Sequence, residues 1–239
     1  MAVNKESNAY TFLFSIAMVV VVGTVLSSLA MGLKPLQQKN QAVKKQMDIL
    51  SAVGIDADRE NAEDKYEKYI VDSYVISAKG ETLDGEDAFV VDVKKQIRDK
   101  TIDPKDRLYP IFEADIDGEK KYVLPVVGNG LWGPIWGYIA IGEDMETVKG
   151  TSFDHKSETP GLGAEINQTD FQDQYIGAKI SIDNKFSEIR VVKDGSGDSD
   201  DQRVDGITGG TITSKGVEEM VNRTMKVYQS YFNSKKKES

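Results

Sequence analysis

The stretch Asp205-Gly-Ile-Thr-Gly-Gly-Thr-Ile-Thr-Ser-Lys-Gly216 decides how the C-terminal part of the chain folds. Its adjacent glycines permit unusual backbone dihedral angles and leave room for a group that approaches Thr211. Apolar residues then recur at helical spacing from Ser214 to Phe232, with two glutamates in the first turn, so the pattern predicts an amphipathic helix. Because a helix N-terminus carries free N–H groups and partial positive charge, a phosphate on Thr211 would lie in a favourable field.

Composition limits the chemistry that the chain can perform. It has 239 residues and a net charge of −9 without a basic block, so nucleic acid is not an expected partner. It has no cysteine and one histidine, His155, which excludes thiolate zinc sites, iron–sulfur ligation and bis-histidine metal sites. No metal ligand and no catalytic nucleophile–base pair is predicted, and a redox cofactor would have to be organic.

The N-terminal region contains a long apolar stretch. Residues 10–33 carry no charge and exceed the ~20 residues needed to span a bilayer, which predicts a transmembrane helix. A signal peptide is the alternative, but the stretch is longer than the usual apolar region of a signal and lacks a convincing cleavage site. Because the span has no ionisable residue, ion transport would require partner subunits.

The remaining patterns predict a mixture of helices and strands, and hence an α+β fold. Apolar residues recur at helical spacing in two segments after the span, and alternating apolar residues predict strands farther along the chain. The predicted helices are 35–53 and 61–74, and the predicted strands are 89–93, a hairpin over 111–127 with its turn at Asp117-Gly118, 135–142 and 186–192.

The segment from Gly128 to Gly133 has the spacing of a dinucleotide-binding fingerprint, Gly-x-Gly-x-x-Gly. That fingerprint requires a helix after the glycines, whose N-terminus binds pyrophosphate. Here Pro134 and a predicted strand follow instead. The pattern therefore does not favour NAD binding by this segment.

Three segments together resemble a known family. Asp205–Thr211 is similar to the flavinylation motif Asp-Gly-x-Ser/Thr-Gly-Ala-Thr, with Gly210 in place of the usual alanine. Gly130-Leu-Trp132 and Glu158-Thr-Pro-Gly-Leu-Gly163 resemble two further segments of the same FMN-binding domains. With the N-terminal span and terminal helix, the chain resembles the covalent FMN-binding NqrC family of the sodium-translocating NADH:quinone reductase. The related flavoprotein of Rnf complexes, RnfG, is the nearest alternative.

The resemblance implies a flavin site. A flavin transferase would attach FMN to Thr211 through a phosphoester bond. An ordinary glycine loop capped by Thr213 or Ser214 is the alternative, as is a core role for Trp132 and Trp136. The other FMN contacts implied by the resemblance are Gly130, Leu131, Trp132, Glu158, Thr159, Gly161, Leu162, Gly163, Thr208, Gly209, Gly210 and Thr213.

The resemblance also implies an electron carrier within a complex that exports sodium, while NADH and quinone bind to other membrane subunits. Its domains would be a tail (1–9), the span (10–33), a helical stalk (34–80) and the FMN-binding domain (81–239). The family implies a bacterial inner membrane protein whose large domain is periplasmic. The lysines after the span favour the cytoplasm instead, by the positive-inside rule. A membrane-anchored binding module without a redox role is the alternative of a different class.

Overall fold

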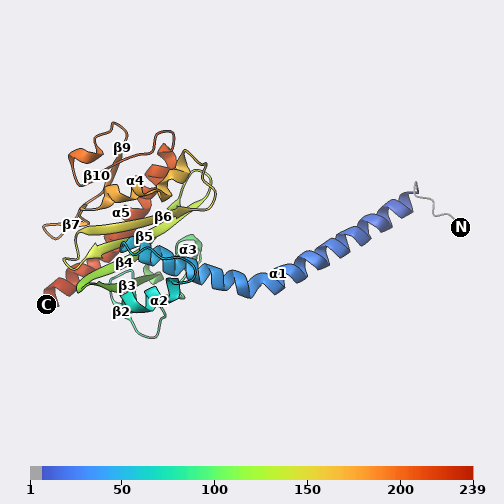
Figure 1. Ribbon diagram of the computed structural model, residues 1–239, viewed down its shortest axis with the longest axis horizontal. Helices are drawn as coiled ribbons and strands as arrows, with labels where there is room; N and C mark the ends of the chain where they lie inside the picture. The colour runs from blue at the N-terminus through green and yellow to red at the C-terminus, as the bar shows by residue number, and fades with distance from the viewer. Residues whose placement is uncertain (1–6, 239) are drawn as a thin grey trace. The chain divides into compact units, whose positions relative to one another are not determined.

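The computed structural model describes residues 7–238, in which the chain forms two compact units, one ending at Lys44 and the other beginning at Lys45. Helix α1 (Asn8–Ala52) contains the predicted span (Figure 1) and continues through Pro35 without a break. The predicted separate helix after Pro35 is therefore the end of α1. Within the described residues, α1 is the one helix long and apolar enough to cross a membrane. Residues 1–6 of the predicted tail lie outside this description.

A six-stranded antiparallel sheet forms the centre of the second unit, in the order β2-β1-β3-β4-β5-β6. The predicted hairpin is confirmed: its turn residues Asp117 and Gly118 both have positive φ angles, 54° and 86°, as a two-residue type I′ turn requires. The predicted strand after Pro134 is also confirmed. The strands are β1 (Ile70–Ser77), β2 (Thr82–Leu83), β3 (Leu108–Ile116), β4 (Glu119–Asn129), β5 (Pro134–Gly142) and β6 (Val148–His155).

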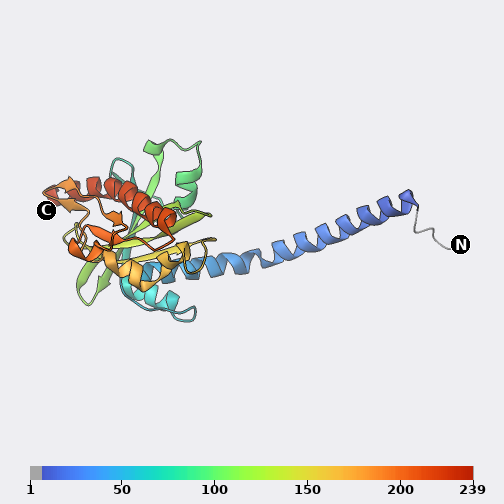
Figure 2. The ribbon, with the colours of Figure 1, turned by 90° about the horizontal axis from the view of Figure 1, so that it is seen from above.

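Both faces of this sheet are covered. Helix α5 (Thr211–Glu238) packs on one face, and the last turns of α1 pack on the other (Figure 2). The alternation along β4 follows from this arrangement, because Leu124 belongs to the α5 side and Val123 to the α1 side. Two short helices, α2 (Ala62–Tyr69) and α3 (Val93–Arg98), precede strands of the sheet.

Glycines allow α5 to approach the end of β4 closely. A Cβ atom on Gly216 would lie 2.3 Å from the carbonyl oxygen of Asn129, and one on Gly128 would lie 2.7 Å from the Cβ of Met220. Larger residues would separate the helix from the strand. The glycines therefore bring the first turns of α5 next to the turn that joins β4 to β5.

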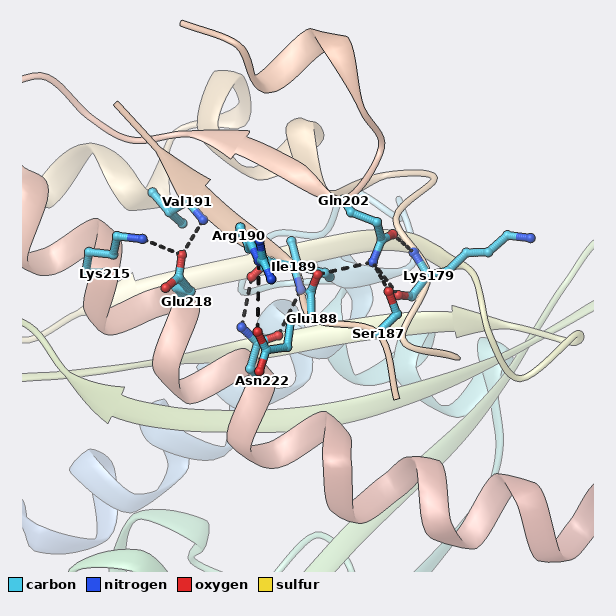
Figure 3. A network of polar contacts seen from close by, with 10 residues as sticks. All are labelled: Lys179, Ser187, Glu188, Ile189, Arg190, Val191, Gln202, Lys215, Glu218 and Asn222. Atoms are coloured by element: carbon cyan, nitrogen blue, oxygen red, sulfur yellow. Dashed lines mark hydrogen bonds and ion pairs between the residues drawn. The ribbon is translucent and has the colours of Figure 1, made fainter. Parts of the chain in front are cut away.

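The chain between β6 and α5 contains α4 (Thr169–Gln172) and short strands: β7 (Ser181–Ile182) pairs with β8 (Lys185–Phe186), and β9 (Arg190–Val192) pairs in parallel with β10 (Arg203–Asp205). Side chains tie this segment together (Figure 3). The Asn222 amide donates to the carbonyl of Ile189 (2.9 Å) and accepts from its N–H (3.0 Å), and Glu218 accepts from the N–H of Val191. These contacts hold β9 against α5, and β10, which pairs with β9, ends at Asp205, the first residue of the Asp205–Thr211 motif.

Several predicted boundaries are wrong. The helix predicted over 61–74 ends at Tyr69, because Ile70 enters β1 and pairs with Ala114. The strand predicted over 89–93 is a turn that leads into α3, whose first turn is capped by the carboxylate of Asp92.

The last two predicted elements also differ. The strand predicted over 186–192 is interrupted between β8 and β9. Helix α5 begins three residues earlier than predicted and extends to Glu238.

Candidate flavin site

Three segments that are distant in the sequence meet at the start of α5. They are the turn 130–133 between β4 and β5, the segment 158–163 after β6, and the loop 208–211. The Trp132 N–H donates to Oε1 of Glu158 (2.8 Å), and the hydroxyl of Thr213 donates to Oε2 of the same carboxylate (2.6 Å). The structure therefore brings together the three motifs that the sequence singled out.

The turn between β4 and β5 is tight. The Gly130 N–H donates to the carbonyl of Gly133 (2.8 Å), and β5 begins at the next residue. No helix follows these glycines, so the requirement of a dinucleotide fingerprint is not met. A Cβ atom on Gly130 would lie 2.6 Å from Oε1 of Glu158, which explains why the closest approach in this turn occurs at a glycine.

Glu158 is a buried carboxylate with protein donors on both oxygens. Its residue is 5% exposed, and Oε1 accepts from the N–H groups of Trp132 and Gly133 (2.8 and 3.2 Å). Burial acts to raise the pKa of Glu158, but hydrogen bonds from Thr213 and the turn backbone outweigh it and hold the pKa below its usual value. The carboxylate is therefore ionised at neutral pH.

The segment after Glu158 folds into a compact turn. The carbonyl of Thr159 accepts from the N–H groups of Leu162 and Ala164 (3.1 Å each), and Gly161 has a φ angle of 75°. A Cβ atom on Gly163 would lie 2.5 Å from Oγ1 of Thr213 and 2.6 Å from Oε2 of Glu158. Gly163 thus allows the Glu158–Thr213 contact to form.

The Leu162 side chain lies against the glycine loop. A Cβ atom on Gly209 would come within 2.5 Å of Cδ2 of Leu162, and Gly209 has a φ angle of 75°. The backbone N–H of Gly163 lies 3.2 Å from the position that a Cβ on Gly210 would take. The Ile207 side chain would lie closer still, at 3.0 and 3.1 Å, so alanine at position 210 would require small shifts of its neighbours, which the glycine found here avoids.

Thr211 is the first residue of α5 and is half-buried, whereas Thr208 and Gly209 are exposed. The carbonyl of Gly210 accepts from the N–H of Ser214 (2.9 Å), so the helix begins before Thr213 and Ser214, and neither of them is its N-cap. The Ser214 hydroxyl instead accepts from the N–H of Ile207 (3.0 Å) and fixes the loop. Thr211 therefore lies in the first helical turn, where an anion is favoured.

Large apolar side chains in these segments are exposed. The exposed fractions are 66% for Trp132 and 50% for Leu131 in the turn, 41% for Leu162 and 58% for Ile212. Trp136, by contrast, is half-buried against the core, and the Nζ atom of Lys94 lies 3.2 Å from its ring centroid. The core role that was the alternative for both tryptophans therefore holds for Trp136 and not for Trp132. An exposed apolar group of this kind commonly marks a binding surface.

A pocket of about 480 Å³ beside the Asp205–Thr211 motif has a different, acidic lining. Asp205 and Ile207 of the motif line it, but none of the predicted FMN contacts does. Three acidic residues, Glu165, Asp170 and Asp205, are among those that line it, and their negative charge would repel a phosphate. We therefore do not assign FMN to this pocket.

Two residues beside the site were not predicted from the sequence. The Nδ1 atom of His155, which is not among the predicted site residues, accepts from the N–H of Glu158 (3.2 Å) and helps to orient that residue. Ile212 was missed because the helix was expected to begin at Ser214. The signal available in the sequence was an apolar residue directly after Thr211.

Comparisons with known proteins agree with this geometry. Residues 130–226 match the FMN-binding domain family. A crystal structure of the NqrC subunit of the Na(+)-translocating NADH-quinone reductase from Parabacteroides distasonis is 39% identical, covers 83% of this chain and 96% of its own, and superimposes with a TM-score of 0.76. That of Shewanella oneidensis NqrC is 25% identical, covers 82% and 97%, and has a TM-score of 0.69. The NqrC subunit from Vibrio parahaemolyticus is 31% identical over 91% of this chain and 90% of its own length. The chain belongs to the NqrC family of Na(+)-translocating NADH-quinone reductases.

Membership in the NqrC family agrees with the architecture. The FMN-binding domain match includes the Gly130 turn, the Glu158–Gly163 segment and the first half of α5, which are the parts that meet around Thr211. The N-terminal apolar helix is consistent with the single-pass anchor of such a protein. The chain is thus one component of a multi-subunit reductase.

Proposed function

We propose that this chain carries electrons within its reductase complex through FMN joined by a phosphoester bond to Thr211. The observation that carries the proposal is the position of Thr211 as the half-buried first residue of α5. N–H groups in the first turn of a helix have no intrahelical acceptor, and together with the helix dipole they stabilise a phosphate.

The apolar side chains around this position suit the rest of the cofactor. Leu131, Trp132 and Leu162 would contact the flavin ring, which is planar and largely apolar, and Ile212 extends the same kind of surface. Thr159 and Thr208 are exposed and could offer polar contacts to the ribityl chain. FMN supplies the redox chemistry, and the protein supplies binding, orientation and electrostatics.

In the whole complex, electron transfer through this flavin would be coupled to sodium export, while NADH and quinone would bind to other subunits. The chain would be anchored in the bacterial inner membrane by residues 10–33, with its large domain in the periplasm. A flavin transferase would act on Thr211 during maturation. The relatives named above are NqrC proteins, which favours this assignment over the RnfG component of an Rnf complex.

Mass spectrometry of the full chain, produced together with a flavin transferase, tests the attachment. Intact mass and peptide mapping should detect one FMN moiety on the peptide that contains Thr211, and Thr211→Ala should remove both the adduct and the yellow colour. Thr208→Ser is the matched control, because it changes a residue of the same loop, keeps the hydroxyl found at that motif position, and should keep the adduct. An adduct that persists in Thr211→Ala, or a wild-type protein that is colourless despite an active transferase, would refute the proposal.

A further inference from the structure

Glu158 connects all three segments of the candidate site. Through Oε1 it accepts from the backbone of the 130–133 turn, and through Oε2 it accepts from Thr213 on α5. Glu158 is itself the first residue of the third segment, 158–163. Within the described residues, the hydroxyl of Thr213 also accepts from the N–H of Leu131 (3.4 Å), which extends the connection to the turn.

The surroundings of the carboxylate leave little freedom for it to move. A glycine lies next to each carboxylate oxygen. A Cβ atom on Gly130 would lie 2.6 Å from Oε1, and a Cβ atom on Gly163 would lie 2.6 Å from Oε2. Both carboxylate oxygens accept hydrogen bonds from protein groups, so contacts within the protein hold the carboxylate in place. A buried charge keeps such a position only while its donors remain in place, because losing them leaves an unpaired charge.

The exposed apolar side chains and the attachment residue belong to the two segments that this carboxylate connects. Leu131 and Trp132 extend from the same turn whose backbone donates to Glu158, and Thr211 lies two residues before Thr213 on the first turn of α5. The carboxylate therefore sets the separation between the apolar side chains and the attachment residue, although it does not belong to the exposed surface itself.

We propose that Glu158 is a positioning residue for the flavin: its carboxylate fastens the 130–133 turn to the first turn of α5 and so fixes Leu131 and Trp132 relative to Thr211. The proposal rests on the assignment of FMN to Thr211 given above. It gives Glu158 an indirect role in place of the direct FMN contact expected from the family resemblance.

Hydrogen exchange tests the proposal without flavin. In a Thr211→Ala background, Glu158→Ala should speed exchange of the Trp132 and Gly133 amides by about ten- to a hundredfold, the range expected for losing hydrogen bonds to a charged acceptor. Glu158→Gln should restore much of the protection, because its Oε1 still accepts from both amides. If Glu158→Ala fails to fold, Thr213→Val tests the other half of the connection, because it removes the hydroxyl that donates to Oε2 of Glu158 and accepts from the N–H of Leu131. Exchange of the Leu131 amide should then become faster, and unchanged exchange there would overturn the proposal.

Asp144→Ala is the matched control. Asp144 accepts from the N–H groups of Glu146 and Thr147 (3.0 Å each) and from the Thr147 hydroxyl, which is the same arrangement in the turn that follows β5. It should speed exchange at Glu146 and Thr147 and leave Trp132 unchanged. Equal protection of Trp132 and Gly133 in wild type and Glu158→Ala would overturn the proposal.

The flavin-loaded protein provides a second readout. Glu158→Ala should keep the FMN mass adduct, while the visible circular dichroism of the flavin weakens and its fluorescence anisotropy falls. The flavin spectra of Glu158→Gln should lie between those of wild type and Glu158→Ala. Unchanged flavin spectra in a correctly loaded Glu158→Ala would also overturn the positioning role. Loss of the adduct from wild type would instead contradict the proposed function, so the two failures are distinguishable.

Discussion

The hydroxyl of Thr213 and the carboxylate of Glu158 form a buried 2.6 Å hydrogen bond between residues that are 55 positions apart in the sequence. This bond joins the first turn of α5 to the segment that follows β6. It also leaves Oγ1 of Thr213 available to the N–H of Leu131.

Replacing Thr213 with valine removes the donor while keeping the shape of the side chain. We expect the free energy of unfolding to fall by about 1–3 kcal/mol, because the Glu158 carboxylate stays buried with one donor fewer. Thr213→Ser keeps the hydroxyl and should lose much less. Urea denaturation of both variants measures the difference, and equal stabilities would contradict the importance of the bond.

Stability should depend on pH through Glu158. Its pKa is lowered in the folded protein from an ordinary value of 4.5, so its contribution is present above pH 4.5 and is lost as the pH falls through the folded pKa. The stability difference between wild type and Glu158→Gln should therefore shrink on acidification from pH 6 to below pH 4.5. Denaturation at several pH values measures it, and a difference that is constant with pH would contradict the prediction.

The two tryptophans should separate binding from stability. Trp132→Ala removes an exposed side chain and should change the free energy of unfolding by no more than about 0.5 kcal/mol, while altering flavin fluorescence. Trp136→Ala removes core packing and the contact with Lys94, and should destabilise by at least about 1 kcal/mol. Thermal unfolding and flavin emission measure the two effects, and a large stability loss from Trp132→Ala would contradict this division.

The Asn222 amide should be necessary for the segment before α5. Asn222→Ala leaves both backbone groups of the buried Ile189 without their side-chain partner and should cost about 1–3 kcal/mol. Asn233→Ala is the control on the same helix, because its amide makes one exposed contact with Asn184 (3.3 Å). Similar losses in both variants would argue against the specific role of Asn222.

Removal of the apolar span should leave a folded domain. A chain that begins at Pro35 retains the whole unit from Lys45 onward. We expect it to remain in solution without detergent and to unfold within about 2 °C of the full chain, since a 1 kcal/mol change shifts the midpoint by about 2–4 °C at this size. A truncated chain that aggregates or melts much earlier would contradict the division into two units.

The glycine motifs and the turn chemistry were recognisable in the sequence because they depend on local geometry. Asp117-Gly118 predicted its hairpin correctly, and Pro134 correctly indicated a strand rather than a helix. Proline fixes its own φ angle, and an Asp-Gly pair tolerates the positive φ angles of a tight turn, so these local preferences hold in any tertiary context.

The wrongly predicted helix and strand boundaries lie where tertiary contacts determine the secondary structure. Tyr69 could have continued a helix, but Ile70 gains a strand partner in Ala114. Val91 and Val93 are buried against the sheet from a turn and from α3, so their apolar character indicated burial rather than a strand. The Glu158–Thr213 bond could not be predicted at all, because nothing local relates two residues so far apart.

The close approach of α5 to β4 constrains the evolution of this domain in a way unrelated to its cofactor. At Gly216 the obstacle to any side chain is the backbone oxygen of Asn129, so no smaller residue elsewhere can compensate for a substitution there. Gly216 should therefore persist even in descendants that have lost flavin chemistry. Its retention alone would say nothing about activity, whereas divergence at Thr211 beside a retained Gly216 would identify a domain that kept its fold and changed its role.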